Sequence, residues 1–169
     1  SRFFTGAPVP AGDDDREWLR QTYRWVFDAP ETDVVRVLGE LSEEVRSCPC
    51  PTPEDACLLE LLRHFPDDRG VLSAYFLNSV ALQPGEAMFL EPNEPHAYMD
   101  GTIIECMANS DNVVRAGLTP RYIDQDVLLE MLSYQGGDIE TVTGVEDADG
   151  DVTYPTPVPD FRVEVWRHD

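Results

Sequence analysis

The chain has 169 residues, and its 12 basic and 33 acidic side chains give a formal charge of −21. This charge repels the phosphates of nucleic acid and of anionic lipid headgroups, so neither is an expected partner. All 12 basic residues are arginines, which excludes Schiff-base chemistry by a lysine of this chain.

The first part of the chain predicts three amphipathic helices. Apolar side chains recur at helical spacing over residues 13–27 and again over residues 31–47. A third helix is expected to begin at Thr52, a favourable N-cap that Pro53 follows, and to end before Pro66. The apolar faces of these helices predict a core, and hence a helical subdomain over residues 1–69.

Beyond Gly70 the pattern favours short strands. Residues 71–82 are apolar, "QPGE" is a turn sequence, and "AMFL" and "GTIIECMA" follow as two more expected strands. A further helix is predicted from about Asp124, which is a suitable cap. We therefore expect a mixed α+β fold, in which residues 70–135 form antiparallel strands of a barrel or sandwich plus one helix.

The last part of the chain predicts a connector and one strand. Residues 136–160 are acidic and rich in glycine and proline, without helical period, and favour an extended or mobile loop. Residues 161–169 begin with an alternating apolar and polar pattern, which predicts the start of a further strand.

Cysteines and leader patterns give two further expectations. Cys48, Cys50 and Cys57 crowd a proline-rich stretch without Cys-x-x-Cys spacing, and Cys106 is remote, so neither a structural zinc site nor a disulfide is expected. No signal peptide or apolar run of membrane length is recognisable, which favours a cytoplasmic location with reduced thiols. Because the sequence begins with serine rather than methionine, we interpret it as a segment of a longer protein.

One histidine lies in a setting that suits metal binding. In "MFLEPNEPHAYMDG", His96 follows Pro95 in a rigid turn between two expected strands. Neutral imidazole is the commonest nitrogen ligand of zinc, although a lone histidine in a turn is also compatible with an ordinary hydrogen-bonded residue.

A longer pattern resembles a known enzyme family. The motifs "PHAY", "ECMA", "SDN" and "VRAGLTP" follow one another between residues 95 and 120, within a stretch from about residue 70 to 134 that resembles the zinc-dependent mannose-6-phosphate isomerases. The resemblance implies a cupin (jelly-roll) barrel, one zinc ion, and reversible conversion of mannose 6-phosphate to fructose 6-phosphate. It makes His96 a zinc ligand and Arg115 the catalytic arginine. The substrate-binding candidates are Tyr98, Glu105, Asp111 and Arg121.

Each of these residues also has a simpler interpretation. Arg115 is compatible with a surface arginine paired with a carboxylate, and Glu105 with the outward residue of an alternating strand. Asp111 is a natural turn former, Tyr98 suits packing in a core, and Arg121 stands where the family often has lysine.

The chain also departs from the family's pattern. The family's other zinc ligands are a glutamine and histidine two residues apart and then a glutamate, and this sequence contains no Gln-x-His. One imidazole is too few ligands for a stable zinc site, so we expect an incomplete barrel that is inactive unless a companion supplies the first half. The alternatives are a non-catalytic cupin-like module that binds sugar phosphates or serves as a scaffold, and a purely structural partner subunit.

Overall fold

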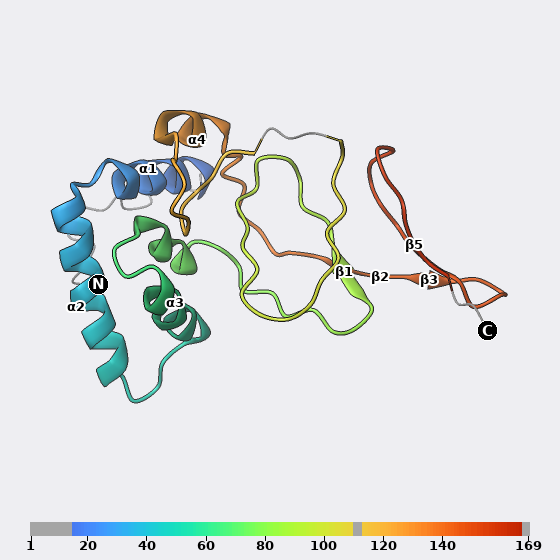
Figure 1. The fold of residues 1–169 in the computed structure, drawn as a ribbon, viewed down its shortest axis with the longest axis horizontal. Helices are drawn as coiled ribbons and strands as arrows, with labels where there is room; N and C mark the ends of the chain where they lie inside the picture. The colour runs from blue at the N-terminus through green and yellow to red at the C-terminus, as the bar shows by residue number, and fades with distance from the viewer. Residues whose placement is uncertain (1–14, 110–112, 167–169) are drawn as a thin grey trace. The chain divides into compact units, whose positions relative to one another are not determined.

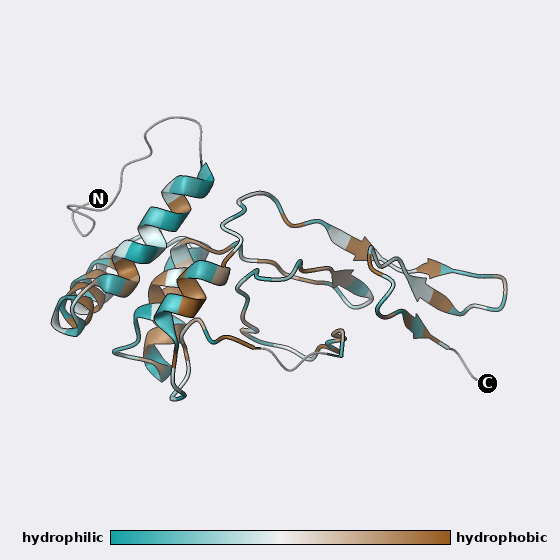
Figure 2. Cartoon of the chain, turned by 90° about the horizontal axis from the view of Figure 1, so that it is seen from above, coloured by the Kyte–Doolittle hydropathy of each residue, from teal (hydrophilic) through white to brown (hydrophobic). Residues whose placement is uncertain are grey.

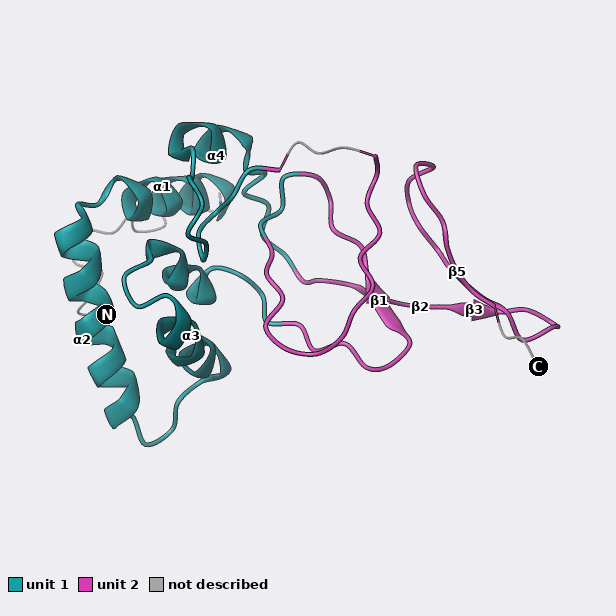
Figure 3. Ribbon diagram, viewed as in Figure 1, with its two compact units in different colours: residues 1–79, 93–95, 114–137 teal, residues 80–92, 96–113, 138–169 magenta. Residues whose placement is uncertain are grey.

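The chain folds into two compact units, as a computed structural model that describes residues 15–109 and 113–166 shows (Figures 1 and 3). Unit 1 comprises Ser1–Ser79, Asn93–Pro95 and Val114–Gly137, and unit 2 comprises Val80–Pro92, His96–Val113 and Asp138–Asp169. Each unit therefore combines several stretches of chain. The division expected from the sequence, into residues 1–69, 70–135, 136–160 and 161–169, stays a prediction.

Unit 1 contains all the helices of the described residues. They are α1 (Asp15–Asp28), α2 (Glu31–Ser47), α3 (Pro53–His64), the 3₁₀ helix η1 (Arg69–Tyr75) and α4 (Gln125–Met131). The four α-helices match those expected from the sequence. None of the described helices is both long enough and apolar enough to cross a membrane.

The core of unit 1 lies between these helices. Leu38 of α2, Leu58 of α3 and Val71 of η1 are almost completely buried. Figure 2 shows the corresponding pattern along the helices, which alternate between hydrophobic and hydrophilic faces. Burying an aliphatic side chain of this size contributes about 1.5–3 kcal/mol, so the packed faces rather than helix propensity hold the unit together.

A capping box starts α3. The Thr52 hydroxyl accepts a hydrogen bond from the Asp55 N–H at 3.2 Å, and the Asp55 carboxylate accepts one from the Thr52 N–H at 2.9 Å. The same carboxylate accepts a bond of 2.7 Å from the Tyr75 hydroxyl, which ties the start of α3 to the end of η1. The bonds from Thr52 and Tyr75 hold the pKa of Asp55 below its ordinary value of 3.8.

We expect Asp55→Asn to lower the free energy of unfolding by about 1 kcal/mol at pH 7, because the reciprocal cap bonds are weakened. A lowered carboxyl pKa gives stability that is present above about pH 4 and is lost as the pH falls through the folded-state value. The difference between wild type and variant, followed by urea unfolding, should therefore shrink between pH 5 and pH 2. Glu54→Gln is the matched control, since it removes a charge from the same turn without touching the box; an equal difference at both pH values would contradict the prediction.

The prediction of a strand over residues 71–82 is wrong. Residues 69–75 form η1 instead, and residues 76–82 carry no strand. Asp68 caps η1 by accepting a hydrogen bond from the Gly70 N–H, and Val71 and Leu72 are buried in the helical core. A short apolar run is compatible with either a buried helix or a buried strand, and here helix packing explains it.

Unit 2 consists of two small antiparallel sheets and long irregular segments. β1 (Glu86–Met88) pairs with β2 (Thr141–Thr143), and β3 (Val145–Glu146), β4 (Val152–Tyr154) and β5 (Val163–Val165) form a second sheet in that order. The strands expected around "AMFL" and after residue 161 are thus confirmed. The described residues combine helices with antiparallel strands, and these strands do not close a barrel.

Two other expectations for unit 2 are wrong. Residues 102–108 form no strand, because the segment has no strand partner and β1 pairs with β2 instead. Residues 136–160 are not a simple loop, since they contain β2, β3 and β4. The acidic run is the turn between β3 and β4, where Asp147 accepts hydrogen bonds from the Asp149 N–H at 2.9 Å and the Asp151 N–H at 3.0 Å.

Candidate functional site

The residues around His96 are brought together by a chain reversal in unit 2. The chain runs from Pro95 through His96 to a bend at residues 100 and 101, where Gly101 has a φ of +108° that suits glycine. It then returns so that Glu105 Oε1 lies 3.6 Å from His96 Nε2. The structure thus places an imidazole and a carboxylate side by side.

Tyr98 joins this pair. Its ring centroid lies 5.7 Å from that of His96, with the two planes tilted by 57°. Partial burial, together with a hydrogen bond to the Glu105 carboxylate and the charge of that group, raises the pKa of Tyr98 to about 12. The phenol therefore stays protonated at neutral pH and serves as a donor to the carboxylate. His96, Tyr98 and Glu105 form what we call the His96 cluster.

The His96 cluster is open to solvent. The side chains of His96 and Glu105 are 41% and 39% exposed. Several large apolar side chains of the same segment are also exposed, among them Ile104 at 90% and Met107 at 63%. An apolar face of this kind on a short irregular segment is typical of a surface that another part of a protein covers.

The chemistry of the His96 cluster fits zinc in part. Imidazole nitrogen and carboxylate oxygen are both zinc ligands, and two atoms bound to one tetrahedral ion lie about 3.4 Å apart, close to the observed separation. A structural site needs four ligands, and no group of three or more histidine, cysteine, aspartate or glutamate side chains suited to a metal occurs among the described residues. Residues 15–109 and 113–166 thus offer two side chains, His96 and Glu105, whose chemistry is compatible with zinc.

The remaining predicted site residues lie elsewhere in the chain. Arg115 and Arg121 are exposed and belong to unit 1. The Arg121 N–H is bonded to the Thr119 hydroxyl at 3.2 Å, which fixes the turn that precedes α4. Asp111 lies outside the described residues.

Known proteins share this sequence and this fold. A protein of Caenorhabditis elegans named as a probable mannose-6-phosphate isomerase is 38% identical over 154 residues, which are 90% of this chain and 37% of that protein. Human mannose-6-phosphate isomerase is 50% identical over 111 residues, or 63% of this chain and 26% of the human one. The crystal structure of mannose 6-phosphate isomerase from Salmonella typhimurium, bound to substrate (f6p) and zinc, matches with a TM-score of 0.78 at 34% identity. It covers 88% of this chain and 38% of the bacterial one.

The chain is a relative of the mannose-6-phosphate isomerases. It spans 37% of the Caenorhabditis elegans protein and less of the human one, so it corresponds to a part of these isomerases. No protein-family model matches the chain. The match to curated isomerases confirms the resemblance expected from the motifs between residues 95 and 120.

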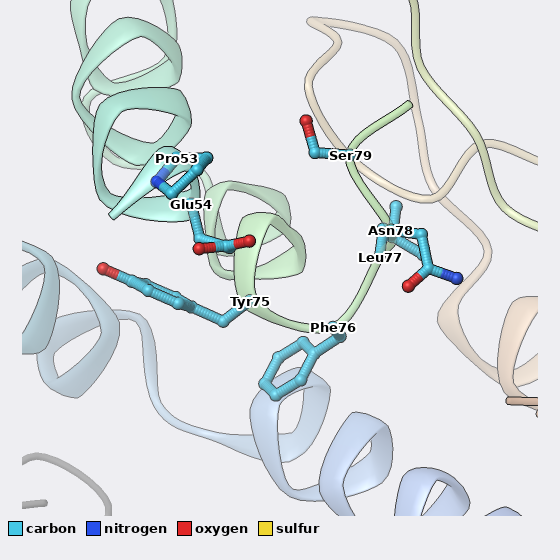
Figure 4. Close-up of a pocket in the computed structure, with 7 residues that line it drawn as sticks. All are labelled: Pro53, Glu54, Tyr75, Phe76, Leu77, Asn78 and Ser79. Atoms are coloured by element: carbon cyan, nitrogen blue, oxygen red, sulfur yellow. The ribbon is translucent and has the colours of Figure 1, made fainter. Parts of the chain in front are cut away.

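A hollow among the described residues of unit 1 is not lined by the predicted isomerase residues. It has a volume of about 520 Å³ and lies beside the start of α3 and the end of η1 (Figure 4). Glu54, Tyr75, Phe76 and Asn78 contribute side chains to its wall. None of the candidate site residues predicted from the sequence lines this hollow.

One contact of unit 1 escaped the sequence analysis. The Asp68 carboxylate accepts a hydrogen bond of 2.8 Å from the Leu118 N–H, within the isomerase motif "VRAGLTP". Two glycines of that region, Gly70 and Gly117, were the only sequence signals, since glycine marks a close approach of two backbones.

Proposed function

We propose that this chain carries part of the active site of a zinc-dependent mannose-6-phosphate isomerase, with a cupin-like arrangement of its strands. The similarity to the substrate-bound and zinc-bound Salmonella typhimurium structure over 88% of the chain supports this proposal most strongly. The substrate is a sugar phosphate, and the reaction is the reversible conversion of an aldose to a ketose. The location in this proposal is the cytoplasm.

His96 is the metal ligand in this proposal. Its Nε2 atom lies 3.6 Å from the Glu105 carboxylate, and the Tyr98 hydroxyl is hydrogen-bonded to the same carboxylate. A bound zinc ion would supply a positive charge that polarises the sugar's oxygen atoms. Glu105 and Tyr98 are the groups of the chain that would then face the substrate and orient its hydroxyls.

Arg115 stabilises developing negative charge. When a proton leaves the carbon beside the carbonyl, an enediol forms and charge builds up on oxygen. A guanidinium stays protonated at every physiological pH and presents fixed donors, so Arg115 can stabilise this charge without taking the proton. Asp111 and Arg121 are assigned to substrate binding, with Arg121 as a candidate for the phosphate group.

The exposed apolar face beside the His96 cluster is consistent with a site that further strands of the protein complete. Met99, Ile103 and Ile104 are each at least 48% exposed. Strands that supply the other ligands would also cover this face, because the relatives are more than twice as long as the chain. The partner in this proposal is therefore the rest of an isomerase barrel.

The decisive experiment is an assay of the protein as its native gene encodes it. We expect turnover of mannose 6-phosphate that disappears after dialysis against a zinc chelator and returns when zinc is added. Circular dichroism at 222 nm should change little on zinc removal, because the helices of unit 1 pack without the His96 cluster. Turnover that survives complete zinc removal would contradict the metal assignment.

A non-catalytic sugar-phosphate-binding module is the second candidate. It is favoured by the lack of a third suitable metal ligand beside His96 and Glu105 among the described residues. Calorimetric titration with fructose 6-phosphate separates the two candidates, since binding without turnover in the presence of zinc supports the module.

A further inference from the structure

Both oxygens of the Asp68 carboxylate are engaged by backbone N–H groups that lie far apart in sequence. Oδ1 accepts a hydrogen bond of 2.7 Å from Gly70, and Oδ2 accepts one of 2.8 Å from Leu118. All three residues belong to unit 1, and Asp68 is partly buried. Hydrogen bonds to an ionised carboxylate are stronger than neutral ones, so this side chain firmly joins η1 to the segment that contains Arg115.

The two backbones approach too closely for side chains. A Cβ added to Gly70 would lie 2.9 Å from the Gly117 Cα, and one added to Gly117 would lie 2.7 Å from the Gly70 Cα. Gly117 also has a φ of +129°, which glycine adopts most readily. The "RAGL" backbone is therefore pressed against the start of η1 at one specific register.

Leu118 has an unfavourable backbone conformation at this contact. Its φ is +56°, in the left-handed region that leucine seldom adopts. The N–H that donates to Asp68 belongs to this same residue. Strained conformations persist where the surroundings determine them, and they are frequent at functional sites. The Asp68 bond is one contact that favours this conformation.

We propose that Asp68, together with Gly70 and Gly117, positions Arg115 for its role in the isomerase reaction. Arg115 lies two residues before Gly117 and three before Leu118, so the backbone that carries it is held at its C-terminal side by the Asp68 carboxylate. The arginine itself is exposed, and the fixed backbone gives its long side chain a defined origin. The Asp68 bonds to Gly70 and Leu118 involve no proposed ligand or substrate group of the described residues, so Asp68 acts through Arg115, and this inference rests on the proposed function of Arg115.

The test is a double-mutant cycle in the protein as its native gene encodes it. We expect Asp68→Ala to lower kcat for mannose 6-phosphate on the order of 10-fold, with a smaller change in KM, because a misplaced stabilising group loses its effect in the transition state. In an Arg115→Ala background the same substitution should leave kcat unchanged, because the group that it positions is gone. Asp67→Asn, one residue earlier, is the matched control and should behave as wild type.

A second variant keeps the inference testable if Asp68→Ala fails to fold. Asp68→Asn preserves the volume and one acceptor oxygen, and it should lower kcat less than Asp68→Ala does. Amide hydrogen exchange of the Leu118 N–H, measured in both variants, should accelerate relative to the Asp67→Asn control. Unchanged exchange at Leu118 would overturn the inference.

The outcomes of the cycle separate this inference from the proposed function. An equal loss of kcat in both backgrounds would show that Asp68 supports the fold generally, and no loss in the wild-type background would show that it is dispensable; either result overturns the inference while the role of Arg115 stands. If Arg115→Ala alone leaves turnover unchanged, the proposed function of Arg115 fails, and the positioning role falls with it.

Discussion

Arg115→Ala is expected to lower kcat for mannose 6-phosphate by about 10² to 10³-fold while zinc remains bound. The reason is electrostatic, because a preorganised guanidinium favours the charged transition state more than the neutral ground state. KM should change little. Steady-state kinetics together with metal analysis of the purified variant measures both quantities.

Two controls make this result specific. Arg63→Ala removes an arginine that is 72% exposed on α3, where it pairs with Glu60, and it should leave kcat unchanged. Arg115→Lys preserves the charge but not the planar donor set, so it should recover only part of the lost rate. An effect of Arg115→Ala on KM alone would assign Arg115 to ground-state binding instead.

The helices of unit 1 were predictable because their signals are local. Thr52 and Asp55 lie three residues apart and form a box within one turn, and Pro53 stands where a helix tolerates it. Asp124 similarly accepts a hydrogen bond of 3.1 Å from the Val127 N–H at the start of α4. Such contacts depend on a few neighbouring residues, so the sequence is sufficient to predict them.

The strands were less predictable because a strand depends on its partner. The residues from 102 to 107 have suitable apolar and β-branched side chains, yet nothing in the described chain pairs with them. In contrast, β2 and β4 arise in a stretch whose composition indicates a loop, since β1 and β5 lie beside them. Whether a distant segment is available for pairing therefore determined both the missing strand at residues 102–107 and the presence of β2 and β4.

The candidate site was predictable in its residues but only partly in its contacts. The motif identified His96 and Glu105, and the Asp100-Gly101 dipeptide could have predicted the reversal that brings them to 3.6 Å. The bond from Leu118 to Asp68 spans 50 residues and has no local signal beyond two glycines. The roles of all the candidate site residues stay predictions: His96, Tyr98, Glu105, Asp111, Arg115 and Arg121.

His96→Ala is expected to abolish zinc binding and turnover together in the protein as its native gene encodes it. A zinc site that loses one of its ligands loses both affinity and geometry, and the remaining Glu105 carboxylate cannot replace an imidazole nitrogen. Metal analysis after gel filtration and an assay with mannose 6-phosphate measure the two losses. Because His96 is 41% exposed, its removal should leave the melting temperature of the zinc-free protein nearly unchanged.

The control for this variant is His64→Ala. His64 is 65% exposed on α3, where its Nε2 atom lies 3.2 Å from Glu60, and it should keep wild-type zinc content and turnover. Glu105→Gln tests the contribution of the carboxylate, since it preserves the shape of the His96 cluster but removes the carboxylate charge. If Glu105 helps to hold the metal or the imidazole, this variant should bind zinc more weakly than wild type and more tightly than His96→Ala. Full zinc content and full turnover in His96→Ala would show that the metal is held elsewhere and that the proposed site is wrong.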